Sequence, residues 1–421
     1  MSLQLCIFED EKTRRFLPLC WTRPVYDLVC GMDSLREKIL RAYAGVKVSF
    51  ACRDYLAGVM REENPGTEIN TLSEERVLFV NGRVLADPGM ASIIPLDGEE
   101  TVYLSGDDVV AVRATGGNLE KLMTKLSGFL KRDDFEIKRE VSVDAVVFGY
   151  IWDLVLRNGR QIAADIRARH EMGGIAGKVH EGVRMLNPSS ITVEKDAVVK
   201  PGVVLDAEDG PVFIDEGAEI FPNAVIQGPA YVGRRSKIKI GAKIYEGTSI
   251  GEMCKVGGEV EESIIHAYSN KQHDGFLGHA YLGMWVNLGA DTNNSDLKNN
   301  YGSVKVFVDG EYVDSRETFV GLMMGDHSKT GINTMINTGS VVGVCCNVFG
   351  AEFPPKFVPS FSWGGGGRFS EYAYSKALET ARRVMARRQV ETTEAYENML
   401  REVFERTAGH RKQFGKASLV E

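Results

Sequence analysis

Long apolar runs and paired cysteines are the features most plainly missing from this 421-residue sequence. No stretch approaches the roughly 20 consecutive apolar residues that a membrane-spanning helix needs. The amino terminus lacks a basic segment followed by an apolar one, so we expect no secretory signal. The seven cysteines are scattered without C-x-x-C spacing. This pattern argues against a disulfide framework or a zinc site and favours reduced thiols in the cytoplasm.

An excess of basic residues is also absent, since 50 Lys and Arg face 58 Asp and Glu, for a net charge of -8. No basic stripe interrupts this balance, which argues against a nucleic-acid partner. A small anionic substrate stays possible, because a few local cations suffice to hold it. The length exceeds that of one ordinary core and predicts two or three domains.

Residues 1–180 alternate short strand-like and helix-like segments. The strand-like runs are rich in Val, Ile, Leu and Phe, and cover 3–9, 46–52, 76–82 and 101–106. Segments 33–43 and 118–130 have helical apolar spacing. This alternation predicts an open α/β sheet, in which ligands lie at the carboxyl ends of the strands.

Residues 190–362 follow a different period. A large aliphatic residue stands at every sixth position from Ile214 to Val256, and a small residue follows each of the first seven by four positions. The aliphatic residues are Ile214, Ile220, Ile226, Val232, Ile238, Ile244, Ile250 and Val256. The small ones are Ala218, Ala224, Ala230, Ser236, Ala242, Thr248 and Cys254. Such a hexad predicts a solenoid whose aliphatic residues stack inside while small residues fit the corners.

Four successive glycines at 364–367 predict a break after the solenoid. The C-terminal segment 368–421 then contains two amphipathic patterns, over 371–388 and 394–407, which predict two helices.

The hexad spacing slips within "KQHDGFLGHAYLG", residues 271–283, and two histidines appear there. Histidine titrates near neutrality and is therefore suited to act as a general base. We expect a loop to leave the solenoid wall here, so that His273 reaches a groove between coils. His279 falls at a repeat position and is interpreted as a packing residue.

Several motifs carry a resemblance to known families. The hexads resemble the left-handed parallel β-helix of hexapeptide-repeat acyltransferases. His273, "LGHAYLG", "VNLGADT" and "NNYG" resemble the bifunctional N-acetylglucosamine-1-phosphate uridyltransferase/glucosamine-1-phosphate acetyltransferase family. "FLPLCWTRPVYDL", "GDHSKTGINTMINTG" and "VPSFSWGG" are similar to a bacterial branch of GlmU-like sugar nucleotidyltransferases. The resemblance implies a Rossmann-like α/β nucleotidyltransferase domain, a left-handed β-helix and a C-terminal helical tail.

The resemblance also implies roles for residues of the β-helix. His273 would be the general base for acetyl transfer, and Gly289 and Ala290 would meet acetyl-CoA through their backbone. The implied substrate contacts are Lys243, Phe276, Asn287, Asn300 and Tyr301. Asp326, His327 and Lys329 form a second polar cluster, which either joins this site or caps a coil. Glu261 stands where the family has a phosphate-binding cation, and Phe276 lacks the usual phenolic hydroxyl.

The N-terminal domain departs further from its relatives. Thr13-Arg14, "LPL" and Thr22-Arg23-Pro24 match the nucleotidyltransferase signature, but residues 9–12 (EDEK) replace its glycines. Gly82-Arg83 stands where a magnesium-binding aspartate is expected, with Asp87, Asp107 or Asp108 as possible replacements. The nucleotide-binding candidates are Arg14, Arg15, Thr22, Arg23, Asn81 and Arg83. The arginines among them are alternatively solvated loop charges, and Mg²⁺ is expected only if this domain is active.

These resemblances predict an acetyl-CoA-dependent acetyltransferase for a sugar phosphate or nucleotide sugar, fused to a sugar-1-phosphate nucleotidyltransferase-like domain. It would be a cytoplasmic homotrimer that serves cell-envelope precursor synthesis, without nucleic-acid or membrane partners. Two alternatives stay open. One is a nucleotidyltransferase with the β-helix as a trimerisation scaffold, and the other is a non-catalytic regulator that binds a sugar nucleotide.

Overall fold

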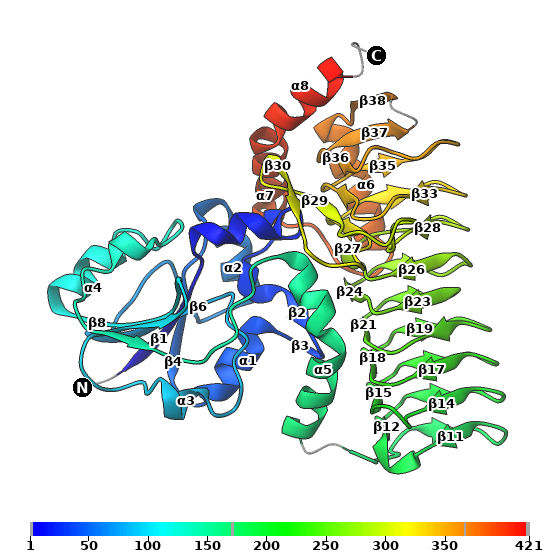
Figure 1. Ribbon diagram of the computed structural model, residues 1–421, viewed down its shortest axis with the longest axis horizontal. Coiled ribbons are helices and arrows are strands. Elements are labelled where there is room, and N and C mark those ends of the chain that lie inside the picture. The colour runs from blue at the N-terminus through cyan, green and yellow to red at the C-terminus, as the bar shows by residue number, and fades with distance from the viewer. Residues whose placement is uncertain (1–2, 170–171, 366–367, 418–421) are drawn as a thin grey trace.

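The computed structural model describes residues 3–169, 172–365 and 368–417 (Figure 1). An α/β domain lies on one side, a tall column of stacked strands on the other, and the C-terminal helices lie at the top of the view. The predicted order of an α/β domain, a parallel β-helix and C-terminal helices is confirmed.

The N-terminal domain is built on a seven-stranded sheet in the order β5-β4-β1-β6-β8-β7-β9. These strands are β1 (Gln4–Phe8), β4 (Lys47–Phe50), β5 (Glu68–Ile69), β6 (Arg76–Asn81), β7 (Thr101–Ser105), β8 (Asp108–Thr115) and β9 (Glu140–Ser142). The short β2 (Val29–Cys30) and β3 (Asp33–Ser34) pair with each other. The helices are α1 (Leu35–Ala42), α2 (Ala57–Glu63), α3 (Met90–Ile93) and α4 (Gly116–Met123). All four predicted strands are present, as β1, β4, β6 and β7.

Helix α5 (Ile151–Arg169) connects the sheet to the solenoid and was not predicted from the sequence. It lies between the two domains (Figure 1). Its buried Asn158 accepts a hydrogen bond from the Gly31 N–H at 2.6 Å and donates one to the Gly247 carbonyl at 2.8 Å. The helix therefore fixes the α/β domain against the β-helix. None of the helices in the described ranges has the length and apolarity that crossing a bilayer requires.

The solenoid is a parallel β-helix with three walls. The first wall contains β10 (Lys178–Val179), β13 (Val198–Val199), β16 (Glu219–Ile220), β19 (Lys237–Ile238), β22 (Lys255–Val256) and β25 (Asn270–Lys271). The second contains β11 (Arg184–Leu186), β14 (Val204–Asp206), β17 (Val225–Gln227), β20 (Lys243–Ile244), β23 (Glu259–Glu261) and β26 (Phe276–Gly278). The third contains β12 (Ile191–Val193), β15 (Val212–Ile214), β18 (Ala230–Val232), β21 (Thr248–Ile250), β24 (Ile264–Ala267), β27 (Tyr281–Met284), β31 (Met323–Met324), β34 (Val341–Val342) and β36 (Phe357–Val358). The upper coils add β28 (Asn293–Asn294) with β33 (Met335–Ile336), and β32 (Lys329–Thr330), β35 (Asn347–Val348), β37 (Ser362–Gly365) and β38 (Arg368–Glu371).

The hexad residues form the core of this solenoid, as predicted. Every aliphatic residue of the pattern is at most 2% exposed, and the seven small residues are 0% exposed. Each coil therefore stacks its aliphatic side chains on those of the next, while small side chains leave room for the corners.

The expected loop at 271–283 is wrong, because β25, β26 and β27 continue the three walls through this segment. The chain instead leaves the solenoid after β28 and returns at β31, with the hairpin β29 (Lys305–Val308) and β30 (Glu311–Asp314) between them. Val304, Val306 and Val308 of this excursion are buried against the α/β domain. The excursion between β28 and β31 thus contributes to the contact between the α/β domain and the β-helix.

The C-terminal segment contains α6 (Tyr374–Ala386), α7 (Glu394–Arg406) and α8 (Ala408–Ala417). The first two helices were predicted, and α8 was not. The predicted break at the glycines is wrong for Gly364 and Gly365, which end strand β37 and pair with β38, while 366–367 lie outside the described residues. Buried residues of α7 share one core cluster with α2 and with the last coils. The C-terminal helices therefore join both domains.

Candidate functional site

His273 lies at the corner where the first and second walls meet, between β25 and β26, and its side chain is exposed. The next coil places Ala290 beside it, because the Asp291 N–H donates to the Asp274 carbonyl at 3.0 Å. The structure thus brings the predicted base next to the Gly289-Ala290 backbone that was predicted to meet acetyl-CoA. We call this row of residues the His273 corner.

The same corner carries exposed apolar residues on the coils below and above His273. Ile240 and Ile332 are 69% and 71% exposed. The Asn333 N–H donates to the Ala290 carbonyl at 2.8 Å, which stacks the Ile332 turn on the Ala290 turn. The corner thus exposes two large aliphatic side chains, on coils to either side of His273.

A buried lysine supports the His273 corner from inside the solenoid. Lys271 is 2% exposed and occupies an interior position, in register with Val256 of the coil below. Its ammonium donates to the Gly257 carbonyl at 3.0 Å and to the His273 carbonyl at 2.9 Å. Burial lowers the pKa of Lys271 to about 8. Lys271 is in phase with the core residues Ile265 and Leu277, so it replaces an aliphatic core residue and fixes the turn that carries His273.

Replacing Lys271 with methionine is expected to change how stability depends on pH. The folded-state pKa of about 8 lies below the ordinary value of 10.5, so between these values the unfolded chain binds more protons. Burying the charged ammonium therefore lowers the free energy of unfolding by its full amount below pH 8. This destabilisation disappears as the pH rises toward 10.5. Urea unfolding of wild type and Lys271→Met should show the wild type gaining about 2 kcal/mol relative to the variant between pH 7 and pH 9.5. Parallel pH profiles would contradict this assignment.

Two predicted substrate contacts flank the corner on the second wall. Lys243 is in register with Glu259, and Glu259 with Phe276. The Lys243 ammonium lies 3.3 Å from the Glu259 carboxylate. Glu261 follows on the same wall, and burial raises its pKa. This wall therefore holds one paired cation and two carboxylates where a sugar phosphate would need positive charge.

Asn287 and Lys329 lie on the first-wall side of the corner. Isolated β-bridges join Asn270 to Asn287 and Asn287 to Lys329, so both residues extend the first wall beyond β25. The Lys329 ammonium donates to the His327 carbonyl at 2.8 Å, and burial lowers its pKa. Asn300 and Tyr301 lie apart from these residues, on the excursion after β28, where Tyr301 is 73% exposed. One chain thus groups four of the predicted substrate contacts around His273, namely Lys243, Phe276, Asn287 and Lys329.

His279 has stronger interactions than its interpretation as a packing residue implied. Its Nδ1 lies 2.8 Å from the Asp296 carboxylate, and its ring stacks on Phe319 at 5.0 Å between centroids. Asp296 and Phe319 belong to the excursion between β28 and β31. The side chain is 12% exposed. His279 therefore ties both ends of the excursion to the wall.

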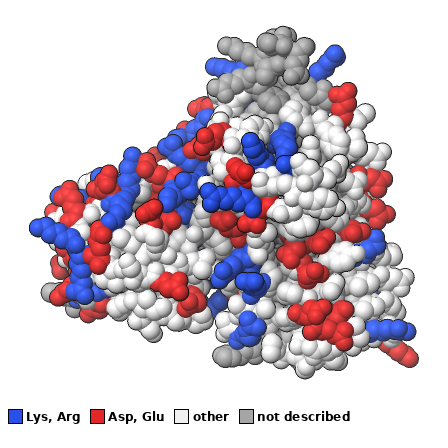
Figure 2. Space-filling model, in the orientation of Figure 1, with Lys and Arg blue, Asp and Glu red and all other residues white. Residues whose placement is uncertain are grey.

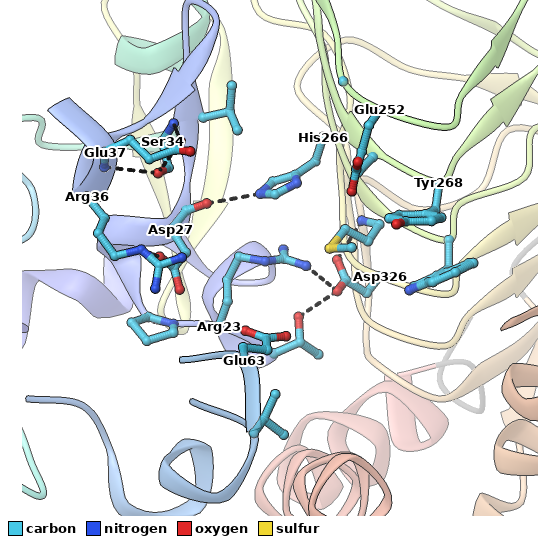
Figure 3. Close-up of a pocket in the computed structure, with 18 of the residues that line it drawn as sticks. Arg23, Asp27, Ser34, Arg36, Glu37, Glu63, Glu252, His266, Tyr268 and Asp326 are labelled. Atoms are coloured by element: carbon cyan, nitrogen blue, oxygen red, sulfur yellow. Dashed lines mark hydrogen bonds and ion pairs between the residues drawn. The ribbon is translucent and has the colours of Figure 1, made fainter. Parts of the chain in front are cut away.

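Asp326 and His327 contact other domains instead of the His273 corner. The Asp326 carboxylate lies 2.5 Å from the Arg23 guanidinium and accepts a hydrogen bond from the Thr22 hydroxyl at 2.8 Å (Figure 3). His327 Nε2 lies 2.7 Å from the Tyr396 hydroxyl of α7. Thr22 and Arg23, predicted to bind a nucleotide, thus connect the α/β domain to the β-helix.

Asp326→Asn is expected to lower the free energy of unfolding by about 3–5 kcal/mol, because Arg23 then stays buried without its countercharge. Burial alone would raise the pKa of Asp326, but Arg23 lowers it below the ordinary value. The pair's contribution is therefore present above the unfolded-state pKa of Asp and is lost as the pH falls through the lower folded-state value. Denaturant titrations at neutral pH measure the effect. A loss below 1 kcal/mol would contradict it.

The other nucleotide-binding candidates lie at the carboxyl ends of β1 and β6. Arg14 and Arg15 follow β1, with their guanidinium groups 5.5 and 5.1 Å from the ring centroids of Phe129 and Tyr150. Asn81 ends β6, is buried, and donates to the Asp10 carboxylate at 2.9 Å. These positions match the usual ligand edge of an α/β sheet.

Arg83 fills this edge with a buried ion-pair cluster. It is 0% exposed and holds Asp10 with two hydrogen bonds, of 2.8 Å from Nε and 2.6 Å from Nη2. Nη2 also lies 2.5 Å from Asp108, which Lys12 approaches at 2.9 Å. Nη1 donates to the Phe148 carbonyl at 2.5 Å. The fixed guanidinium therefore stands between the two carboxylates.

The residues at this edge do not fit the magnesium ion that the nucleotidyltransferase fold implies. Asp10 and Asp108 are neutralised by Arg83 and Lys12, and a cation between them would face the buried guanidinium. Within residues 3–169, 172–365 and 368–417, no group of three or more acidic, His or Cys side chains is arranged to hold a metal. Asp107 and Asp87 are not part of the cluster.

Parts of the chain are similar to known proteins. Residues 5–171 match the family model described as sugar nucleotidyl transferase. The chain is 28% identical over 198 residues to the bifunctional protein GlmU of Synechococcus elongatus, covering 42% of this chain and 40% of that protein. It is 34% identical over 142 residues to a bifunctional sugar-1-phosphate nucleotidylyltransferase/acetyltransferase of Sulfurisphaera tokodaii, covering 33% and 35%. Parts of this chain are therefore similar to a sugar nucleotidyl transferase family and to bifunctional GlmU proteins.

These matches span less than half of the length of each of these relatives. Among solved structures, the UDP-N-acetylglucosamine acyltransferase from Campylobacter jejuni aligns with 54% of this chain and 94% of its own, at 16% identity and a TM-score of 0.20.

Sequence reasoning missed Lys271, Asp296 and the partners of Arg83. A signal for Lys271 was present, since it stands six residues after Ile265 and six before Leu277, both of which are core residues. A lysine in phase with the aliphatic residues of a solenoid predicts a buried ammonium. Asp10, Asp108 and Asp296 lie far along the chain from their partners, and no local pattern indicates these pairs.

Proposed function

We propose that this protein transfers an acetyl group from acetyl-CoA to an amino or hydroxyl group of a sugar phosphate or nucleotide sugar. The His273 corner carries this proposal, because it combines an exposed imidazole with the Gly289-Ala290 turn of the next coil. The relatives named as bifunctional nucleotidylyltransferase/acetyltransferase proteins support the same chemistry.

The residues at the corner supply the steps that acetyl transfer needs. His273 takes the proton from the acceptor's nitrogen or oxygen as that atom attacks the thioester carbonyl. The carbon–sulfur bond breaks as the new carbon–nitrogen or carbon–oxygen bond forms, and the proton passes to the leaving thiolate. The Ala290 backbone N–H stabilises the developing oxyanion, while the Gly289 N–H donates to the Thr330 hydroxyl at 2.9 Å and holds this turn in place. Lys271 holds the His273 carbonyl and so fixes the turn.

The proposal includes a homotrimer in which a neighbouring copy covers the His273 corner. Ile240 and Ile332 frame His273 and are more than two thirds exposed in one chain. A neighbouring β-helix would bury them and turn the open corner into a groove for the pantetheine arm. All seven cysteines are buried free thiols, which supports a reducing compartment such as the cytoplasm.

The α/β domain contributes binding of a sugar nucleotide in this proposal. Figure 2 shows Lys and Arg interspersed with Asp and Glu over the face in view, so recognition depends on a few local cations. Arg14 and Arg15 follow the carboxyl end of β1 and are the cations proposed to contact the phosphates. No step is assigned to magnesium, because Arg83 occupies the place between the carboxylates.

Release of free thiol from acetyl-CoA tests the proposal. The acceptors are glucosamine-1-phosphate, other amino-sugar phosphates and amino-sugar nucleotides, and a parallel assay follows pyrophosphate release from nucleoside triphosphates. We expect acceptor-dependent thiol release. Pyrophosphate release without any thiol release would favour a nucleotidyltransferase with a scaffolding β-helix, and tight binding without turnover would favour a regulator.

A further inference from the structure

A cavity of about 730 Å³ lies where the α/β domain, the β-helix and the α6–α7 connection meet (Figure 3). Its lining includes Arg23, Asp27, Glu252, His266 and Trp285. The volume is typical of a site for a small molecule. The cavity is separate from the His273 corner, because its β-helix residues lie at and beside the corner between the third and first walls.

The cations that line the cavity are held by carboxylates. Arg23 pairs with Asp326 at 2.5 Å, and Arg36 pairs with Asp27 at 2.9 Å. Arg169 pairs with Asp33, and Arg234 lies 3.7 Å from Asp215. Each of these guanidinium groups lies beside a carboxylate, which weakens its attraction for an anionic ligand.

Carboxylates at the cavity are in excess. Glu63, Glu252 and Glu391 line it and are exposed. In the described part of the chain, none of these three forms an ion pair within 4.0 Å. They come from α2, the β-helix and the α6–α7 connection, so three separate parts of the fold bring negative charge to one cavity. A positively charged ligand would be attracted to this arrangement.

His266 offers a hydrogen-bond acceptor to the same ligand. Its Nε2 lies 3.0 Å from the Asp27 backbone carbonyl (Figure 3), and because a carbonyl only accepts, Nε2 carries the hydrogen. Burial lowers the pKa of His266 to about 4, so the ring is neutral and Nδ1 is an acceptor. Nδ1 is buried and has no hydrogen-bond partner among the described residues. A ligand with an N–H or O–H group would satisfy it.

An aromatic pair completes the cavity. Tyr268 stacks on Trp285 with 4.4 Å between ring centroids and 25° between planes. Both line the cavity, and Figure 3 shows Tyr268 on the same side as Glu252. An aromatic face beside carboxylates favours an organic cation over a hydrated inorganic one.

We propose that this cavity binds a small organic cation, a protonated amine on a hydroxylated scaffold. The ammonium is attracted by the carboxylates of Glu63, Glu252 and Glu391, a hydroxyl or N–H group donates to His266 Nδ1, and the carbon skeleton packs beside the Tyr268–Trp285 pair. This site is additional to the proposed acetyl-transfer corner and does not depend on it.

Calorimetric titration of the full chain at about pH 6 tests the site with three probes: glucosamine, glucose and inorganic phosphate. Glucosamine and glucose differ at one carbon, where an ammonium replaces a hydroxyl. We expect glucosamine to bind at least tenfold more tightly than glucose, and phosphate not to compete. Equal binding of glucose, tighter binding of phosphate, or no glucosamine binding to the folded protein would overturn the proposal.

The variant Glu252→Gln with Glu391→Gln assigns the binding to this cavity. Both residues are exposed, so folding should be unaffected, and the affinity for glucosamine should fall at least tenfold. Glu402→Gln, an exposed α7 residue that pairs with Arg406, is the matched control and should bind like wild type. Unchanged affinity in the double variant would overturn the site. Thiol release should be the same in all three proteins, so failure here is distinguishable from failure of the acetyl-transfer proposal.

Discussion

Replacing His273 with alanine is expected to lower the rate of acetyl transfer by about 10²- to 10⁴-fold, the range that a positioned general base contributes. The side chain is exposed and its turn is fixed through the backbone by Lys271, so its loss should leave the fold intact. Thiol release from acetyl-CoA measures the rate, and thermal unfolding checks the fold. Binding of CoA should change little, because the Gly289-Ala290 backbone stays in place.

His279→Ala is the informative control for this prediction. His279 pairs with Asp296 and is 12% exposed, so its loss should loosen the excursion after β28 and lower stability more than it lowers the chemical rate. Full activity in His273→Ala together with lost activity in a folded His279→Ala would contradict the assignment and make His279 the base.

Replacing Arg83 with methionine is expected to lower the free energy of unfolding by about 3–5 kcal/mol. The change leaves Asp10 and Asp108 without the guanidinium that holds both of them. Removing one partner of a buried ion pair costs more than removing the whole pair, because the remaining charge stays desolvated. Urea or guanidinium unfolding at neutral pH, followed by circular dichroism, measures the loss.

The matched control is Arg139→Met, whose exposed arginine pairs with the exposed Glu99. A surface pair of this kind contributes about 0–1 kcal/mol. The triple variant Arg83→Met, Asp10→Asn and Asp108→Asn should regain part of the stability lost in Arg83→Met alone, because both carboxylates of the cluster are then neutral and only the partly exposed Lys12 loses its partner. A loss in Arg83→Met no larger than that of the control would contradict the buried-cluster account.

The hexad pattern predicted the β-helix because each coil buries the same kind of side chain at the same position. The aliphatic side chains from Ile214 to Val256 stack without interruption. A six-residue period in the local sequence is therefore enough to predict the β-helix. The strands of the N-terminal sheet were also predictable, from β-branched and apolar runs such as 76–82. The His273 corner followed from motifs of the same short range.

The contacts between domains could not be predicted in this way. Arg23 lies 303 residues from Asp326 in the sequence, and Thr22 lies 304. Both looked like parts of a nucleotide loop, because their neighbours match that motif. In the sequence, Arg83 was noticeable only because it replaces an expected aspartate. Its structural role depends on Asp10 and Asp108, which the fold brings to the same sheet edge. Ion pairs between residues far apart in the chain leave no periodic pattern in the sequence, so they cannot be predicted from it.

The most direct test of the central claim is transfer of a labelled acetyl group from acetyl-CoA to a panel of amino-sugar phosphates and nucleotides, with EDTA present and with His273→Ala alongside. The account predicts labelled acceptor from the wild type despite the chelator, and about 10²-fold less or lower from the variant. No labelled acceptor from folded, trimeric wild type, or equal labelling by the variant, would contradict it.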